Sequence, residues 1–198
     1  MPKPYKIVLA SGSPRRQQFF KDFDLEDQFD FEIRLKEIDE IYPNHLKAEE
    51  ITNYLAELKA SAFKDDLAEN EILITSDTLV WLKDRALGKP KDYDDAFLIL
   101  KSLSNATHEV ITSVCFKTTT KTETIFEVTK VTFTELSDAS IHYYLKEYKP
   151  FDKAGAYGIQ EWIGLIGITK IEGSYTNVVG LPTEKVYAYL TKNYSNNL

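Results

Sequence analysis

The stretch that most constrains the fold lies near the N-terminus, where an apolar run passes directly into a helix pattern. Residues 5–10, YKIVLA, have the length and composition of a short buried strand. The segment 11–13, SGS, then leads to Pro14, which the first turn of a helix tolerates, and Ser13 is placed to cap that helix. A strand, a tight turn and a helix in this order predict an α/β arrangement.

The rest of the chain continues this alternation and then changes to a ribbon. We expect a strand at 29–34, a helix with an apolar stripe at 51–62, a strand at 72–82, a threonine-rich antiparallel ribbon at 107–118 and 122–135, and a final helix from Pro182 to about Lys192. The sequence has no internal repeat and no long linker. It therefore predicts one α/β or α+β domain over residues 1–198, with a mixed sheet and flanking helices.

Composition excludes several classes of function. Lys and Arg total 24 against 31 Asp and Glu, and the net charge of -7 disfavours broad attachment to nucleic acid or to an anionic membrane. No apolar run approaches the roughly 20 residues of a membrane span. We therefore expect no nucleic-acid partner and no membrane partner.

The single cysteine, Cys115, cannot form an internal disulfide and excludes a multi-cysteine zinc site. The N-terminal MPKPYKIVLA is too short and too polar for a secretory signal. Both observations predict a cytoplasmic protein. Tyrosines near the C-terminus could cover a homodimer surface, although core packing accounts for them with fewer assumptions.

The turn after the first strand is a candidate phosphate site. Backbone N–H groups at the start of a helix favour anions, and Arg15 and Arg16 would add two planar cations whose geometry matches phosphate oxygens. The plainer alternative is that Ser13 only caps the helix and both arginines are solvated. The segment is not a P-loop, because no G-x-x-x-x-G-K-[ST] pattern occurs.

A second candidate is Asp77, which interrupts the apolar pattern of LITSDTLVWL. A carboxylate in such a place needs a cation, a metal ion or a hydrogen-bond network, and it is suited to act as a magnesium ligand or a general base. A strand-end aspartate in a loop is the plainer alternative. Lys89, in the turn GKP, could meet a phosphate or be a solvated turn residue.

The third candidate is a glycine-rich region, since six of the eight glycines lie between Gly155 and Gly180. Gly155 and Gly158 would let the chain bend closely around a ligand, and the amide of Gln160 could pair with the edge of a nucleotide base. The alternative is that these glycines only form turns and bulges.

Taken together, these segments resemble the Maf family of nucleoside triphosphate pyrophosphatases over nearly the whole chain. The shared motifs, in the family's order, are SGSPRR at 11–16, IDE at 38–40, LAELKA at 55–60, SDT at 76–78, GKP at 88–90, HEVIT at 108–112, DKAGAYGIQ at 152–160 and IEGSYTNVVGLP at 171–182. The resemblance implies a Maf/Ham1-like (ITPase-like) fold, with a mixed sheet, flanking helices and two lobes around a cleft. It also implies housecleaning hydrolysis of a nucleoside triphosphate to the monophosphate and pyrophosphate, assisted by a divalent metal cation such as Mg²⁺, Mn²⁺ or Co²⁺.

The DKAGAYGIQ segment looks like the branch of the family that acts on dTTP and UTP. Two other interpretations stay open at this point. One is a pyrophosphatase for 7-methyl-GTP or another modified purine nucleotide, and the other is a non-catalytic nucleotide-binding regulator of septum formation. A secondary role in cell division arrest is compatible with the enzyme.

The resemblance also implies roles for individual residues. Proton acceptance falls to Asp77, and the metal would be held by Glu40 and Asp77. Substrate choice is implied for Arg15, Thr78 and Gln160. Phosphate binding is implied for Ser11, Arg16, Lys59 and Lys89.

Overall fold

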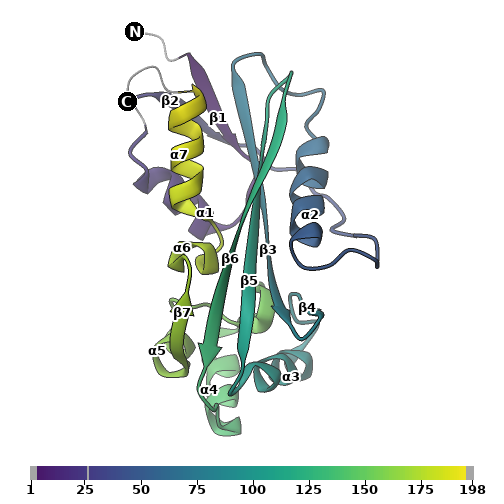
Figure 1. Cartoon of the computed structure of the whole chain (residues 1–198), viewed down its shortest axis with the longest axis vertical. Coiled ribbons are helices and arrows are strands. Elements are labelled where there is room, and N and C mark those ends of the chain that lie inside the picture. Colours follow the sequence, from purple (N-terminus) through teal and green to yellow (C-terminus); the bar gives the residue numbers. More distant parts are fainter. Residues whose placement is uncertain (1–3, 26, 195–198) are drawn as a thin grey trace. The chain divides into compact units, whose positions relative to one another are not determined.

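The computed structural model describes residues 4–25 and 27–194, and its strands form one seven-stranded sheet (Figure 1). Along the sheet the strand order is β2-β1-β3-β5-β6-β7, and β4 pairs with β3 off this path. The strands are β1 (Tyr5–Leu9), β2 (Phe29–Ile33), β3 (Glu71–Leu82), β4 (Arg85–Leu87), β5 (Thr107–Lys117), β6 (Thr122–Phe133) and β7 (Ile168–Glu172).

The sheet is mixed, as predicted. β1 pairs in parallel with both β2 and β3, whereas β4 pairs antiparallel with β3 and β7 pairs antiparallel with β6. The helices are α1 (Pro14–Asp22), α2 (Glu49–Ser61), α3 (Tyr93–Leu103), α4 (Asp138–Tyr148), the 3₁₀ turn η1 (Ala154–Ala156), α5 (Trp162–Gly167), α6 (Tyr175–Val179) and α7 (Thr183–Tyr194). The α/β class and the flanking helices are confirmed.

The chain divides into two compact units. The first comprises residues 1–77, 112–126 and 180–198, and the second comprises residues 78–111 and 127–179. Each unit has its own buried core. The single domain over 1–198 and the cleft between two lobes stay predictions.

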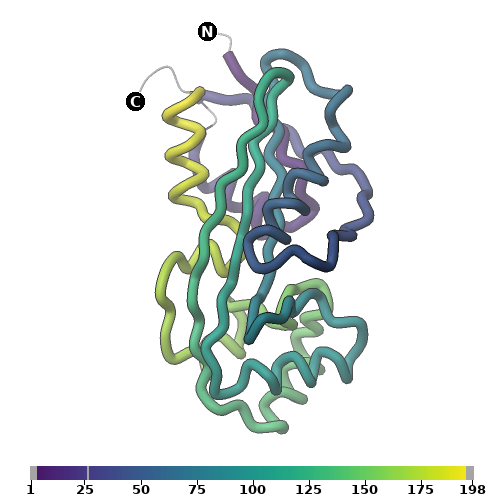
Figure 2. Tube along the Cα trace, turned by 45° about the vertical axis from the view of Figure 1, so that its right-hand side comes forward, coloured from purple at the N-terminus to yellow at the C-terminus, as the bar shows by residue number. Residues whose placement is uncertain are grey.

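In the first unit, residues on β1 and β3 alternate between two cores. Ile7 and Ile72 pack with residues of α1 and α7, whereas Val8 and Leu73 pack with residues of α2. Because successive side chains of a strand point to opposite faces, α2 covers one face and α1 and α7 cover the other. Figures 1 and 2 show this arrangement, with α7 and α2 on opposite sides of the strands.

The second unit has one continuous core, formed by the ends of the long strands and by α3, α4 and the segment around η1. Capping side chains define both larger helices. Asp92 accepts a hydrogen bond from the backbone N–H of Asp95 at 2.8 Å, and Ser137 accepts one from Ser140 at 3.1 Å. These interactions satisfy N–H groups that a helix leaves without partners in its first turn.

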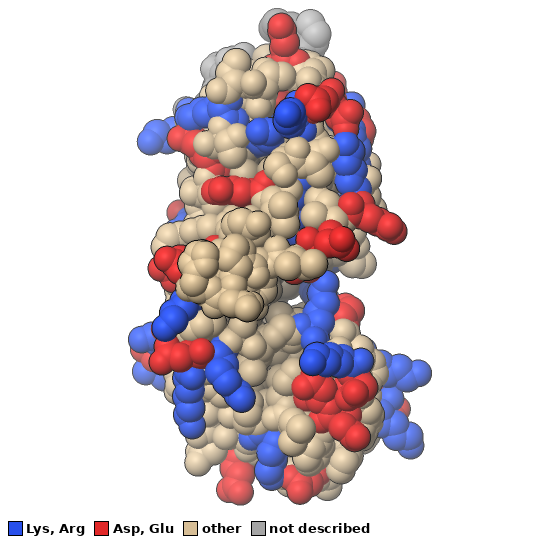
Figure 3. Space-filling model, turned by 90° about the vertical axis from the view of Figure 1, so that its right-hand side faces the viewer, with Lys and Arg blue, Asp and Glu red and all other residues tan. Residues whose placement is uncertain are grey.

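None of the helices within residues 4–25 and 27–194 has the length and apolarity needed to cross a membrane. On the face drawn in Figure 3, basic and acidic side chains are interspersed.

Candidate active site

The first part of the predicted site lies in the first unit, where β1 ends and α1 begins. The backbone N–H of Ser13 donates to Ser11 Oγ at 3.3 Å, and the side-chain amide of Gln17 donates to the Ser11 carbonyl at 3.0 Å. Ser13 Oγ in turn accepts from the backbone N–H of Arg16 at 3.5 Å, which confirms Ser13 as the N-cap. The turn is therefore held by its own side chains, and it ends at a helix N-terminus that favours anions.

Arg16 is fixed by two backbone carbonyl groups. Its Nε donates to the Gly180 carbonyl at 2.8 Å and its Nη1 donates to the Ser76 carbonyl at 3.2 Å. Burial lowers the pKa of Arg16, although the nearby carboxylate of Asp77 acts in the opposite direction. Arginine begins from so high a pKa that it stays charged at neutral pH. A positive charge is thus held beside the middle of β3.

Lys59 is the centre of a charged cluster. Its Nζ lies 2.7 Å from Asp77 Oδ1 and 2.9 Å from Glu40 Oε1, and it donates to the Ser76 carbonyl at 3.4 Å. Arg16 and Lys59 therefore share one carbonyl acceptor. We call Arg16, Glu40, Lys59, Ser76 and Asp77 the Asp77 cluster. Of the three partners expected for Asp77, namely a cation, a metal ion or a hydrogen-bond network, the structure shows a cation, Lys59.

The position of Lys59 follows from a buried hydrogen bond one step away. The Thr75 hydroxyl donates to the Ala56 carbonyl at 2.6 Å and so joins β3 to α2. Lys59 lies three residues after Ala56 on the same side of the helix, and Asp77 lies two residues after Thr75 on the same face of the strand. The two periodicities bring the ammonium and the carboxylate together.

The Asp77 cluster has oxygen ligands that suit a magnesium-type ion. Glu40 and Asp77 converge on a single cation, so their carboxylates approach one point. Among the residues that the structure describes, no group of three or more His, Cys, Asp or Glu side chains is arranged to hold a metal. Mg²⁺ is commonly bound by one or two carboxylates together with substrate phosphates, so the residues present fit that ion.

Three predicted residues, Thr78, Lys89 and Gln160, belong to the second unit. Thr78 follows Asp77 on β3, and Lys89 and Gln160 are both exposed. The backbone N–H of Gly155 donates to the Gly88 carbonyl at 3.1 Å, so the loops that carry Lys89 and Gln160 touch each other.

Residue 155 has to be a glycine because of its backbone conformation and its close approach to β3. Its φ of 70° lies in the left-handed region, and a Cβ there would be 2.7 Å from Val80 Cγ2. A larger residue would therefore separate the loop from β3. Turn formation, the plainer alternative for this glycine, is part of its role.

The structure brings the predicted residues together in two groups. Arg16, Glu40, Lys59 and Asp77 meet in the first unit beside the turn that contains Ser11, and Arg15 neighbours Arg16 on α1. The loops of Lys89 and Gln160 meet in the second unit. The single pocket that would contain all of them, and the role of each residue, stay predictions.

Sequence reasoning did not find the two carbonyl groups that orient Arg16. Those of Ser76 and Gly180 are backbone atoms, which no side-chain pattern reveals. The one signal available was glycine in the GLP motif, because Gly180 has a φ of 128°.

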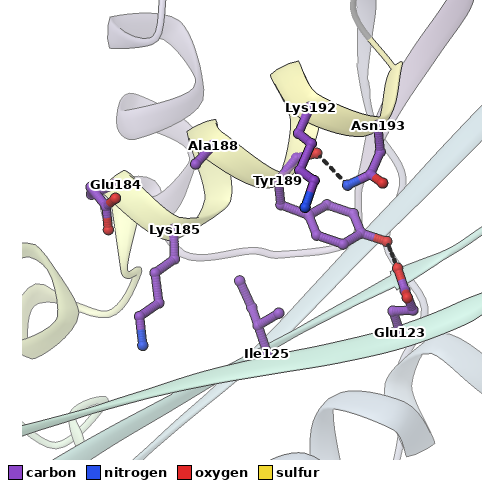
Figure 4. Close-up of a pocket in the computed structure, with 8 residues that line it drawn as sticks. All are labelled: Glu123, Ile125, Glu184, Lys185, Ala188, Tyr189, Lys192 and Asn193. Carbon is purple, nitrogen blue, oxygen red and sulfur yellow. Dashed lines mark hydrogen bonds between the residues drawn. The ribbon is translucent and has the colours of Figure 1, made fainter.

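A separate groove of about 380 Å³ lies between α7 and β6 (Figure 4). Its lining residues are Glu123, Ile125, Glu184, Lys185, Ala188, Tyr189, Lys192 and Asn193. The Tyr189 hydroxyl donates to the carboxylate of Glu123, and the charges along the groove are of both signs. None of the residues predicted from sequence for the active site lines it.

A helix N-terminus with two fixed cations beside a mixed sheet is typical of α/β proteins that bind phosphate groups. The comparison with family models narrows this class. The chain belongs to the family described as Maf-like protein, whose model matches residues 6–193.

Curated relatives cover nearly the same length. A dTTP/UTP pyrophosphatase of Flavobacterium psychrophilum is 73% identical over 185 residues, which are 93% of each chain. Its counterpart in Flavobacterium johnsoniae is 69% identical over 96% of this chain and 95% of the relative, and that in Christiangramia forsetii is 54% identical over 95% and 94%. A solved nucleoside-triphosphatase, titled dITP/XTP pyrophosphatase, of Mycobacterium abscessus is 14% identical, covers 93% of this chain and 92% of its own, and has a TM-score of 0.47.

Proposed function

We propose that this protein is a nucleoside triphosphate pyrophosphatase that hydrolyses dTTP and UTP to the monophosphate and pyrophosphate. The observation that carries the proposal is the convergence of Arg16, Lys59, Glu40 and Asp77 around the Ser76 carbonyl. Membership of the Maf-like family and the printed names of the curated relatives support it. The proposed activity is cytoplasmic and serves to remove unwanted nucleotides.

The reaction requires a water molecule to attack the α phosphorus in line with the bond to the β phosphate. A new bond forms between the water oxygen and the α phosphorus, the α–β bridging bond breaks, and its electrons leave with pyrophosphate. Asp77 would orient the water and accept its proton, using the carboxylate oxygen that does not contact Lys59. Arg16 and Lys59 would offset the negative charge that grows on the departing pyrophosphate.

Charge balance explains why a divalent cation is part of the proposal. Within the Asp77 cluster the two basic side chains are matched by two carboxylates, so the cluster alone supplies no excess positive charge for a triphosphate. Glu40 and Asp77 would hold the ion, which when bound supplies positive charge to the phosphate oxygens. Ser11 and Lys89 would bind further phosphate oxygens.

Base selection is assigned to Gln160, with Arg15 and Thr78. The side-chain amide of Gln160 has one acceptor and two donor hydrogens, so it can pair with the adjacent carbonyl and N–H groups of uracil or thymine. Cytosine presents an amino group where uracil has a carbonyl. An oriented amide therefore discriminates between UTP and CTP.

The test is pyrophosphate release from a panel of UTP, dTTP, CTP, GTP, ITP and 7-methyl-GTP, with Gln160→Ala and the exposed control Gln18→Ala. We expect wild-type protein to prefer UTP and dTTP, and Gln160→Ala to lower the UTP to CTP ratio of kcat/KM at least about tenfold. Gln18→Ala should leave that ratio unchanged. Preference for a purine nucleotide would contradict the proposed substrate, and binding without turnover would favour a nucleotide-binding regulator instead.

A further inference from the structure

The loop that carries Gln160 combines a buried backbone with one exposed polar side chain. Residues 155–159 are all buried, whereas Gln160 is exposed. We call residues 153–161 the Gln160 loop. Because its backbone is enclosed, the position of the Gln160 amide depends on the contacts that hold the buried residues.

Tyr144 of α4 makes two of these contacts, one on each side of Gln160. Its hydroxyl oxygen accepts the backbone N–H of Gly158 at 3.0 Å, and its O–H donates to Glu161 Oε2. Tyr144 has no exposed surface. Burial is the main cause that raises the pKa of Tyr144, and the contact with Glu161 adds to it, so the hydroxyl keeps the proton that it donates.

The two ends of the Gln160 loop are also joined. Lys153 Nζ lies 3.2 Å from Glu161 Oε1, and the Lys153 side chain is only 10% exposed. At Gly158 a Cβ would lie 2.8 Å from Glu161 Cδ, so the backbone approaches this carboxylate as closely as only glycine allows. A single carboxylate thus holds the end, the beginning and, through Tyr144, the middle of the loop.

A second anchor comes from β5. His108 Nε2 and the Tyr157 hydroxyl are 2.7 Å apart, and both side chains are buried. Within the described part of the chain His108 Nδ1 is buried and has no hydrogen-bond partner. The hydrogen bond between His108 and Tyr157 therefore joins the Gln160 loop to β5.

Taking the proposed function as given, we propose that Tyr144 and His108 are positioning residues that hold the Gln160 loop and thereby set the selection of the nucleotide base. Neither residue is assigned contact with the reacting phosphate. Among the pyrimidine nucleotides, this arrangement selects those whose base presents a carbonyl beside an N–H group, as uracil and thymine do and cytosine does not. A loosened loop lets the Gln160 amide move to positions that pair equally well with an amino group.

The main test is Tyr144→Phe, which keeps the ring and removes both hydroxyl contacts. The matched control is Tyr148→Phe, the same change on the same helix at an exposed residue whose ring stacks on Tyr144. We expect Tyr144→Phe to lower the UTP to CTP ratio of kcat/KM about tenfold, mainly through a higher KM for UTP. Tyr148→Phe should leave the ratio at the wild-type value.

A second variant tests the proposal independently in case Tyr144→Phe does not fold. Tyr157→Phe removes the hydroxyl that meets His108 and keeps a ring that fits the core. It should lower the same ratio, by less than Tyr144→Phe, because the Glu161 and Gly158 contacts stay. Hydrogen exchange at residues 158–161 should become faster in both variants and not in Tyr148→Phe.

The decisive readout is the effect of each variant in a Gln160→Ala background. If the contacts act through Gln160, Tyr144→Phe changes the UTP to CTP ratio in the wild-type background and not in Gln160→Ala. An unchanged ratio in folded Tyr144→Phe and Tyr157→Phe, or an equal change in both backgrounds, would overturn the proposal.

The proposed function fails in a different way. It is contradicted by wild-type protein that prefers another nucleotide, whatever the variants do. In that case the same variants are compared on the preferred and the least preferred nucleotide. Loss of that preference supports the positioning role, and an unchanged preference overturns it.

Discussion

The Asp77 cluster and the Gln160 loop are both tied to buried strands, but different interactions hold them. In the Asp77 cluster, Lys59 makes ion pairs with two carboxylates, and Arg16 is held by backbone carbonyl groups. The Gln160 loop has one ion pair, between Lys153 and Glu161, and is held in addition by two neutral side chains, the hydroxyl of Tyr144 and the imidazole of His108. Under the proposed function, the charges of the Asp77 cluster would respond to charge that develops on the phosphates, whereas the buried hydrogen bonds of the Gln160 loop would hold the shape of the loop.

The largest expected effect is that of Asp77→Asn. The substitution preserves size and an acceptor for Lys59 but removes the proton acceptor, so kcat should fall about 10²- to 10⁴-fold. The matched control is Asp138→Asn, which alters an exposed ion pair with Lys101. Pyrophosphate release at saturating UTP measures both variants. Near-normal turnover in Asp77→Asn would remove Asp77 from its assigned role.

Arg16→Ala should lower kcat about 10²- to 10³-fold, since in the proposed reaction it deletes a fixed donor to the leaving pyrophosphate. The exposed Arg85→Ala on β4 should have no such effect. Urea unfolding checks that the variant is folded, because the carbonyl groups of Ser76 and Gly180 lose a donor. A raised KM with unchanged kcat would instead assign Arg16 to ground-state binding alone.

The buried His108, which contacts the Gln160 loop through Tyr157, predicts a pH dependence of stability. Burial lowers the pKa of His108 to about 4, below the value of about 6.5 expected when unfolded. Between these two pH values the unfolded state binds more protons than the folded state. The contribution of neutral His108 to the free energy of unfolding is therefore complete above pH 6.5, and about 3 kcal/mol of it is lost progressively as the pH falls toward 4.

The measurement is the free energy of unfolding in urea from pH 7 to pH 4, for wild-type protein, His108→Gln and the exposed control His142→Gln. His108→Gln should reduce the acid-dependent loss, and His142→Gln should retain it. If the free energy of unfolding falls equally steeply with pH in wild-type protein and in His108→Gln, burial does not hold His108 neutral.

The smallest effect concerns another carboxylate of the first unit, Glu71. Arg34 Nη2 lies 2.8 Å from Glu71 Oε1, and this contact is the largest cause that lowers the pKa of Glu71. A lowered pKa in the folded state gives stability that is present above the unfolded pKa and is lost in acid. Arg34→Gln should cost about 1–3 kcal/mol at pH 7.

That cost should shrink as the pH falls below the ordinary pKa of a glutamate, about 4.3, because the Glu71 carboxylate of the unfolded chain then begins to bind protons. Urea unfolding at pH 7 and pH 3 measures it. Lys64→Gln, at an exposed residue, is the control. A cost that is the same at both pH values would mean that the ion pair does not contribute.

The sequence predicted the Asp77 cluster better than the Gln160 loop. A proline after a capping serine located the start of α1, and a carboxylate inside an apolar strand predicted a partner, which could be a cation, a metal ion or a hydrogen-bond network. The sequence alone did not identify Lys59 as that partner, because the contact depends on how α2 packs on β3.

The Gln160 loop was harder to predict because its contacts join residues that are far apart in the sequence. Tyr144 and Gly158 are 14 residues apart, and His108 and Tyr157 are 49 apart, so neither pair follows from helix or strand periodicity. Helix α3 was also not predicted from the sequence, although this helix has local signals, with Asp92 as its cap and Ala96, Ile99 and Leu103 at helical spacing. Glycine density predicted an unusual backbone at 155–158 but not the tyrosine and histidine that hold it.

The proposed reaction requires water to attack the α phosphorus of UTP. Hydrolysis in water enriched in ¹⁸O, followed by ³¹P nuclear magnetic resonance of the products, measures where the water oxygen goes. We expect one ¹⁸O atom on the phosphate of UMP and none in pyrophosphate. Label in pyrophosphate, or release of orthophosphate with UDP, would rule out attack at the α phosphorus.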